Sequence, residues 1–160
     1  MNDLVDDLID EWASERPGLD CSALSVVVRI QLLGKLLGES AEEALAGHGL
    51  KLWEYDVLSA LRRQGKPYEL LASDLAKASM LTSGTITTRV DGLEGRGLVR
   101  RRSDPSDRRA VRVRLTQKGK EVVDGAIHTR VDRADDQLRA LSSKQRLSVS
   151  TALRKILATA

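Results

Sequence analysis

Residues 81–119 read LTSGTITTRVDGLEGRGLVRRRSDPSDRRAVRVRLTQKG, and this stretch decides the fold. Its first part carries Ile86, Val90 and Leu93 at positions i, i+4 and i+7, which places three apolar side chains on one face of a helix. Thr82 is a residue type that commonly caps the start of a helix, and two glycines follow the last apolar position. The pattern therefore predicts a short helix that begins near Thr82 and ends at the glycines.

The second part of this stretch changes from a helical to an alternating pattern. Residues 98–102 lead into a turn at 103–107 that contains Asp and Pro, and residues 108–115 follow. The last segment alternates between apolar residues and arginines, so that one face is apolar and the other is basic. Two such segments joined by a turn of this composition predict a β-hairpin.

Helical periodicity is also present on both sides of this stretch. Pro and Gly residues separate the segments, and Thr116 and Ser142 are suited to cap the last two helices. The sequence predicts helices near residues 4–16, 26–45, 52–64, 69–78, 116–138 and 142–157. The expected order of elements is α-α-α-α-α-β-β-α-α.

Two short helices followed by a basic hairpin form the winged helix-turn-helix plan. We therefore expect a mainly α fold with a small β-hairpin wing, flanked by N- and C-terminal dimerisation helices. The outer helices carry more apolar surface than one small domain can cover, which favours packing against a partner. The expected division is residues 1–48 for the N-terminal dimerisation helices, 49–116 for the DNA-binding domain and 117–160 for the C-terminal dimerisation helices.

The charges are distributed unevenly along the chain. The formal net charge is +3, but residues 1–20 contain seven acids against one arginine, and residues 96–120 contain ten basic residues against two acids. A concentrated basic segment attracts polyanions even when the whole chain is nearly neutral. The alternative interpretation is a solvated basic surface without a partner.

The helix predicted to begin near Thr82 and the tip of the predicted hairpin carry residues suited to double-stranded DNA. Short hydroxyl side chains allow close approach to the major groove, and an arginine at a hairpin tip fits the narrow minor groove. Serine and threonine also cap helices for purely local reasons, which is the alternative for the helix. The expected DNA-binding residues are Thr82, Ser83, Thr85, Thr87, Thr88, Arg108 and Arg109. We expect Asp104 and Asp107 to fix the hairpin turn by binding backbone N–H groups or the side chains of Arg108 and Arg109.

Several other classes of protein are disfavoured. No apolar run approaches the length of a membrane span, and the acidic, amphipathic N-terminus differs from a secretory signal. Cys21 is the single cysteine, so we expect a reducing, cytoplasmic location. His48 and His128 lie far apart without acid or cysteine clusters, and no catalytic or phosphate-binding motif is present. We therefore expect no enzyme activity, no cofactor and no metal site.

The decisive stretch resembles the core signature of the MarR family of transcription regulators. The resemblance rests on Leu93-Glu94, Gly97-Leu98-Val99, Asp104-Pro105, Asp107-Arg108-Arg109, and Leu115-Thr116 with Gly119. It implies a homodimer in which the N- and C-terminal helices interlock and each recognition helix reads one half of a palindrome. Repression is the default role that the family implies.

A narrower resemblance is to the MarR branch that contains the urate-responsive and PecS-type regulators. It rests on EWASERPGLD, EYDVLSALRRQGKPYEL and MLTSGTITTRVD. In that branch four residues are associated with the ligand, and the matching positions are Trp12, Asp56, Arg89 and Arg101. The resemblance implies a small-molecule effector, urate or a related anion. The alternatives are a core role for Trp12, an ion pair for Asp56 and DNA contacts for the two arginines.

The sequence leaves two rival functions open. Some MarR relatives sense oxidants through an N-terminal cysteine, and Cys21 at the start of a helix is the candidate here. The second rival is a helical interaction module that does not bind DNA. Single-stranded nucleic acid is disfavoured because aromatic residues make up 2% of the chain and no Phe is present.

Overall fold

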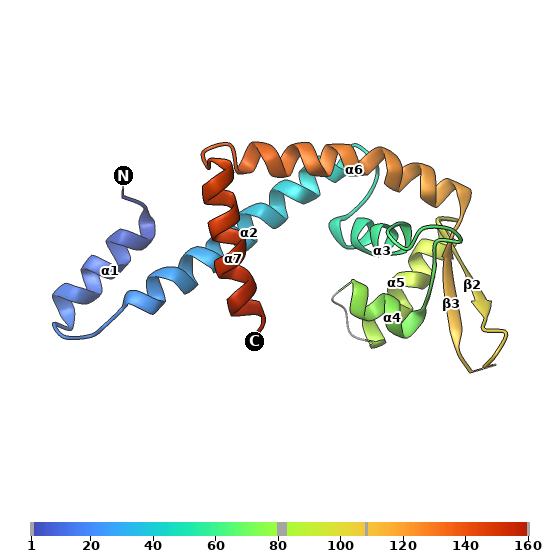
Figure 1. Ribbon diagram of the computed structural model, residues 1–160, viewed down its shortest axis with the longest axis horizontal. Coiled ribbons are helices and arrows are strands. Elements are labelled where there is room, and N and C mark those ends of the chain that lie inside the picture. The colour runs from blue at the N-terminus through green and yellow to red at the C-terminus, as the bar shows by residue number, and fades with distance from the viewer. Residues whose placement is uncertain (1, 80–82, 108, 160) are drawn as a thin grey trace. The chain divides into compact units, whose positions relative to one another are not determined.

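The structure is a computed structural model that describes residues 2–79, 83–107 and 109–159. Its elements are labelled in Figure 1 and are α1 (Leu4–Glu15), α2 (Ser22–Ala46), α3 (Leu52–Arg62), β1 (Glu69–Leu71), α4 (Ala72–Ala78), α5 (Ser83–Gly95), β2 (Val99–Ser103), β3 (Val111–Leu115), α6 (Gln117–Gln137) and α7 (Ser143–Leu157). The chain divides into two compact units, and the boundary between them along the chain falls within α2, after Ser40. The expected fold class, mainly helical with a small antiparallel sheet, is confirmed.

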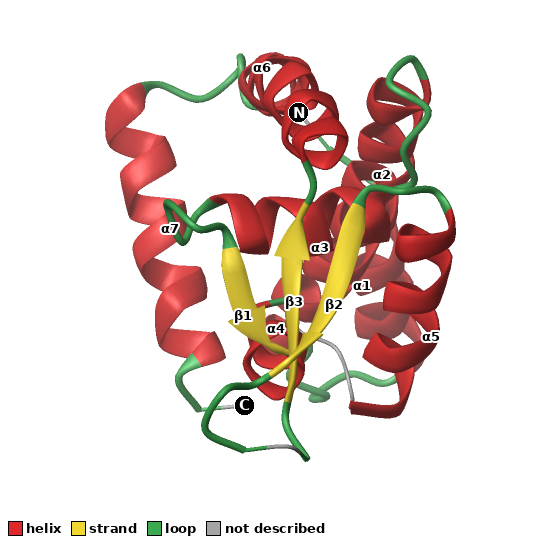
Figure 2. Ribbon diagram, turned by 90° about the vertical axis from the view of Figure 1, so that its right-hand side faces the viewer, coloured by secondary structure: helices red, strands yellow, loops and turns green. Residues whose placement is uncertain are grey.

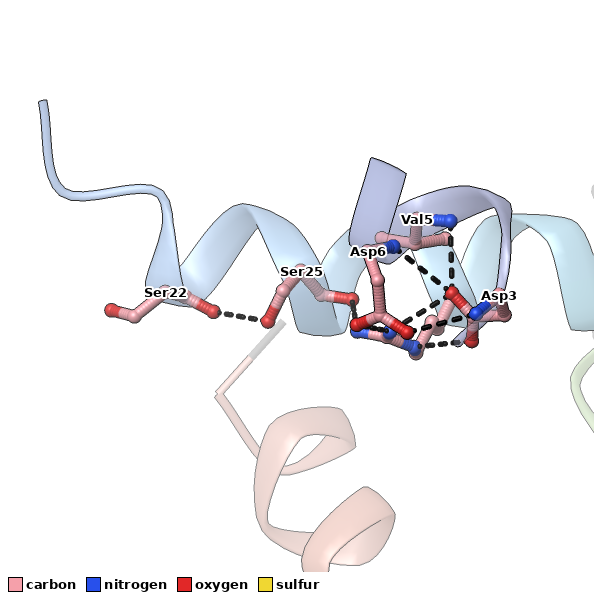
Figure 3. Close-up of polar contacts among 6 residues, drawn as sticks. Asp3, Val5, Asp6, Ser22 and Ser25 are labelled. Atoms are coloured by element: carbon pink, nitrogen blue, oxygen red, sulfur yellow. Dashed lines mark hydrogen bonds and ion pairs between the residues drawn. The ribbon is translucent and has the colours of Figure 1, made fainter. Parts of the chain in front are cut away.

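The first unit consists of α1 and most of α2. Asp3 caps α1 by accepting hydrogen bonds from the backbone N–H groups of Val5 (2.8 Å) and Asp6 (3.1 Å) (Figure 3). Arg29 of α2 donates to the carboxylates of Asp3 (2.9 Å) and Asp6 (2.6 Å), and this pairing links the two helices. Most apolar side chains of this unit are exposed, including Leu24, Val26, Val27, Ile30, Leu33 and Leu36. The unit therefore has little core of its own.

The second unit contains the hydrophobic core. Helices α3, α4 and α5 pack together against one face of the sheet, and α6 packs on α3. The fully buried side chains include Leu58, Leu61, Leu75, Val90, Leu93, Leu98, Val99 and Val113. The predicted apolar stripe of α5, with Ile86, Val90 and Leu93, lies in this core as expected.

The sheet corrects one prediction. Residues 69–71, expected to begin a helix, form the strand β1, which pairs antiparallel with β3 from Glu69 opposite Arg114 to Leu71 opposite Arg112. The strand order is β1-β3-β2, and α4 begins only at Ala72. Local periodicity favours a helix here, but the backbone of β3 would otherwise lack hydrogen-bond partners along one edge. The element order is therefore α-α-α-β-α-α-β-β-α-α.

The last two helices begin where their capping residues predict. The Thr116 hydroxyl accepts a hydrogen bond from the Gly119 N–H (2.9 Å), and the Ser142 hydroxyl accepts one from the Gln145 N–H (3.4 Å). In α7, whose residues are all described, no side chain is buried. No helix in the described part of the chain is long and apolar enough to cross a membrane.

Candidate nucleic-acid interface

Helix α5 presents a polar surface opposite its buried stripe. Ile86, Val90 and Leu93 fix the helix in the core, and Gly84, Thr87 and Thr88 are exposed on other faces. Of the predicted DNA-binding residues, Thr87 and Thr88 are thus accessible and Thr85 is partly buried. Ser83 is the first residue of α5, and Thr82 lies outside the described residues. The geometry matches that of a recognition helix, which must present small polar groups to base edges.

The turn of the hairpin is organised by Asp104. Its carboxylate accepts hydrogen bonds from the Ser106 N–H (2.7 Å), the Ser106 hydroxyl (2.5 Å) and the Asp107 N–H (3.3 Å), and it forms an ion pair with Arg112. Hydrogen bonds from Ser106, together with the Arg112 guanidinium, hold the pKa of the Asp104 carboxyl well below its usual value. The expectation that both acids of this turn bind backbone N–H groups is confirmed. The arginine that pairs with Asp104 is Arg112 of β3, which lies across the hairpin, and not Arg109; Arg108 lies outside the described residues.

The tip of the hairpin presents a cation to solvent. Arg109 is exposed, and its backbone N–H donates to the Asp107 carboxylate (2.8 Å). Arg108, the other predicted tip residue, lies outside the described residues. Within the described part of the chain, neither acid of the turn forms an ion pair with Arg109, because Asp104 pairs with Arg112 and Asp107 binds the Arg109 backbone N–H, and the Arg109 side chain is exposed.

Arg101 connects the hairpin to helix α5. Its guanidinium forms ion pairs with Asp91 and Glu94 (3.0 Å) and donates to the carbonyl oxygen of Thr87 (2.9 Å). Its backbone N–H also donates to Glu94 (2.8 Å). These acceptors span two turns of α5, so one side chain of β2 holds the helix and the wing in a fixed relation. We call this set of contacts the Arg101 clamp.

Arg89 points toward α3. Its guanidinium lies over the ring of Trp53, 5.0 Å from the ring centroid, in a cation–π arrangement. Trp53 is three residues before Asp56 on α3, so the two side chains lie on neighbouring positions of one helix surface. Asp56 is thus part of α3, and Arg89 contacts the same part of that helix through Trp53. Both are predicted ligand residues.

Asp56 lines a groove of about 400 Å³ between α3 and α6. Burial raises the pKa of the Asp56 carboxyl, and the positive charges of Arg130 and Arg63 oppose this effect, followed by that of Arg89. Arg63 also donates to the Ser59 hydroxyl (3.2 Å) and to the carbonyl oxygen of Ala78 at the end of α4 (3.3 Å). The groove thus combines two arginines and two acids with apolar surface, and its lining residues are Tyr55, Asp56, Ser59, Arg63, Arg130, Val131, Ala134 and Asp135.

The remaining candidates lie elsewhere. Trp12 belongs to the first unit and is 43% exposed, so it is not a core residue of that unit. Cys21 also belongs to the first unit and is buried, which limits the access of oxidants to its thiol. Among the described residues, no three His, Cys, Asp or Glu side chains gather as metal ligands would.

Comparison with known proteins shows the family to which this chain belongs. A family model described as MarR family matches residues 48–110, from just before α3 to the residue that precedes β3. The chain belongs to the MarR family. It is 29% identical over 152 residues to the HTH-type transcriptional regulator PecS of Dickeya dadantii (strain 3937). The aligned residues cover 95% of this chain and 92% of PecS.

Other MarR-type proteins are similar in sequence and in structure. The HTH-type transcriptional repressor YetL of Bacillus subtilis (strain 168) is 32% identical over 112 residues, which cover 70% of this chain and 66% of YetL. The crystal structure of Sco3205, a MarR family transcriptional regulator from Streptomyces coelicolor in complex with DNA, superposes with a TM-score of 0.80 at 26% identity. That match covers 87% of this chain and 88% of Sco3205.

Sequence reasoning misses three residues of this MarR chain that the geometry brings to the candidate sites. The apolar pattern places Trp53 on the inner side of its helix, although its position three residues from Asp56 is a signal that both lie on one surface. Arg63 and Arg130 come from helices far apart in sequence, and no local pattern brings them together at the groove.

Proposed function

We propose that this protein is a dimeric transcription regulator, most simply a repressor, that binds palindromic double-stranded DNA. Helix α5 enters the major groove, and the hairpin tip with Arg109 enters the adjacent minor groove. The observation that carries the proposal is the Arg101 clamp, because it joins a hydroxyl-bearing helix to a basic wing as one rigid unit. Such a regulator acts in the cytoplasm, where its operator lies.

Selection of operator sequences from a random duplex library tests the DNA part of the proposal. We expect a palindrome whose half-sites are separated by one helical turn, about 10 base pairs, or a multiple of it. Arg109→Ala should weaken binding and lower the slope of log affinity against log salt by about 0.9 for each phosphate that the variant no longer neutralises. Arg139→Ala, which removes an exposed charge just after α6, is the matched control. A purified protein that prefers no duplex over competitor DNA contradicts the proposal.

We further propose that a small anionic or aromatic ligand releases the DNA, with urate as the first candidate. Asp56 and Arg89, with Trp53 and the groove between α3 and α6, support an effector site on this part of the chain. A planar anion is suited to bidentate pairing with guanidinium groups. A ligand that draws Arg89 from Trp53 shifts α5, and it moves the equilibrium only by its differential affinity for the two states.

Tryptophan fluorescence tests the ligand part separately. The chain has two tryptophans, so Trp12→Phe leaves Trp53 as the single reporter next to Arg89. We expect urate or a related purine or phenolic anion to change Trp53 emission in this variant and to release bound operator from the unmodified protein. Arg89→Gln should abolish both effects. If no anion releases operator up to the millimolar range, the ligand part fails while the DNA part stands.

The proposed roles of Trp12 and Arg101 in ligand binding need a separate measurement. Arg101 is held by two acids of α5, so a ligand must displace these ion pairs before it engages the guanidinium. Trp12→Phe should weaken urate binding if the Trp12 indole supplies a contact. Unchanged affinity in that variant assigns the aromatic contact to Trp53.

A further inference from the structure

The outer face of the sheet carries an unusual arrangement of like charges. In the register of β2 and β3, Arg100 lies directly opposite Arg114, and Arg102 lies directly opposite Arg112. The alternate residues of both strands, such as Val99 and Val113, are buried against the helices. Figure 2 shows α3 and α4 on the far side of the strands, so the arginines project from the open side. We call Arg100, Arg102, Arg112 and Arg114 the arginine face.

Most of this positive charge is not neutralised within the described part of the chain. Arg112 pairs with Asp104 and lies 3.5 Å from Glu69. Arg100, Arg102 and Arg114 form no ion pair with a described acidic residue. Like charges directly opposite each other destabilise an antiparallel pair, and this applies to Arg100 and Arg114, because the charge of Arg112 is already paired with acids. A bound anion removes this repulsion, so the face is predisposed to bind one.

The shape and composition of the face favour a long duplex over a small anion or a single strand. The four arginines occupy two successive outward positions on each of the two adjacent strands β2 and β3, behind the wing tip that carries Arg109. Positive charges repeated along two strands match the repeated phosphates of a polymer better than one small anion. The outward-facing positions of β1, β2 and β3 are Glu69, Leu71 and the four arginines, and none of them is an aromatic residue on which unpaired bases stack.

We propose that the arginine face binds the phosphate backbone of duplex DNA that flanks the operator. This inference rests on the proposed function, because it takes the wing tip as the edge of the operator contact. The wing would then contact DNA at its tip for specificity and through its strands for affinity. The flanking contact involves only phosphates, so it depends on the length of the duplex and not on its sequence.

The test compares two duplexes of the selected operator, one ending at the selected palindrome and one extended on each side by about 10 base pairs of unrelated sequence, one helical turn. We expect the extension to raise the affinity of the unmodified protein by about tenfold at low salt and to steepen the salt slope by about 0.9 for each additional phosphate that the protein neutralises. The variant Arg100→Gln, Arg102→Gln, Arg114→Gln should lose this increase and keep its affinity for the short duplex. Arg112 is left in place because it holds Asp104.

The matched control removes the same number of positive charges at another place. Arg139→Gln, Lys144→Gln, Lys155→Gln changes exposed residues of α7 and of the segment that joins it to α6, and should keep the increase from flanking DNA. If the unmodified protein binds the short and the extended duplex with equal affinity, this inference is wrong and the proposed function stands. A triple arginine variant that keeps the increase overturns it equally. An unmodified protein that binds neither duplex contradicts the proposed function itself.

Discussion

Asp104 shows how one acidic residue supports a basic surface. Its carboxylate is buried and receives hydrogen bonds from Ser106 and Asp107 together with the ion pair from Arg112. An acid at this place repels phosphates, but it fixes the turn from which Arg109 projects. The sequence pattern indicates the turn, whereas the partner of Asp104 becomes evident only when β2 and β3 are paired.

The pKa of Asp104 leads to a prediction about acid stability. Because the folded-state pKa lies below the ordinary value of 3.8, the stabilisation is complete above that value and is lost as the pH falls through the window below it. We expect Asp104→Asn to lower the melting temperature at neutral pH and to flatten the decline between about pH 4 and pH 2. Thermal unfolding across this range measures both effects. Asp136→Asn, at an exposed position of α6, should leave the profile unchanged.

Arg101 allows a structural role to be separated from a ligand role. If the clamp operates, Arg101→Ala should lower the free energy of unfolding of the ligand-free protein by about 1–2 kcal/mol and weaken operator binding. Arg101→Lys keeps the charge but loses the planar fork, so it should recover only part of the loss. Chemical denaturation without ligand measures the effect. Unchanged stability in the alanine variant would assign Arg101 to the ligand alone.

At the scale of elements, the junction between the wing and α6 depends on a glycine. A Cβ atom at Gly119 would lie 2.0 Å from the carbonyl oxygen of Leu98 and 3.2 Å from Leu115 Cδ2. The first turn of α6 therefore packs directly on the backbone that leads into β2. This close approach explains in physical terms why the matched motif has glycine three residues after Thr116.

Gly119→Ala should consequently destabilise the protein by about 3 kcal/mol, because backbone atoms cannot move aside as a flexible side chain can. Gly125→Ala in the same helix is the control. The nearest atom to its Cβ is His48 Nδ1 at 3.7 Å, which is an ordinary contact. There the alanine should be neutral or stabilise by up to about 1 kcal/mol through helix propensity. Equal effects of the two substitutions in urea denaturation would refute this account of the junction.

The elements that could be predicted from sequence are those with strong local signals. The stripe of α5, the turn at Asp104 and the caps Thr116 and Ser142 are all evident in the sequence. Strand β1 is not, because three residues carry too little periodicity and their conformation depends on pairing with β3. The Arg101 clamp and the groove escape sequence reasoning for the same reason, since both join segments that are separate in the chain.

At the scale of the whole molecule, basic and exposed apolar side chains are concentrated on different elements. The basic surface lies on the hairpin, whereas exposed apolar side chains gather on α1, α2, α6 and α7. Leu147, Leu153, Ile156 and Leu157 of α7 are all exposed. A helix of 15 residues without a buried side chain gains little from folding against its own chain. This distribution supports the proposed association with a second copy.

The dimer prediction can be tested on α7 itself. Leu153 and Ile156 lie on one face of the helix, and Ser148 and Thr151 have the same spacing and are centred about 140° away around the helix axis. We expect Leu153→Glu with Ile156→Glu to convert the dimer to a monomer in sedimentation equilibrium and to weaken operator binding, because two half-sites then bind independently. Ser148→Glu with Thr151→Glu adds the same charge and should leave a dimer. A monomeric unmodified protein, or a double-glutamate variant at 153 and 156 that still dimerises, would contradict the assignment of this helix to the interface.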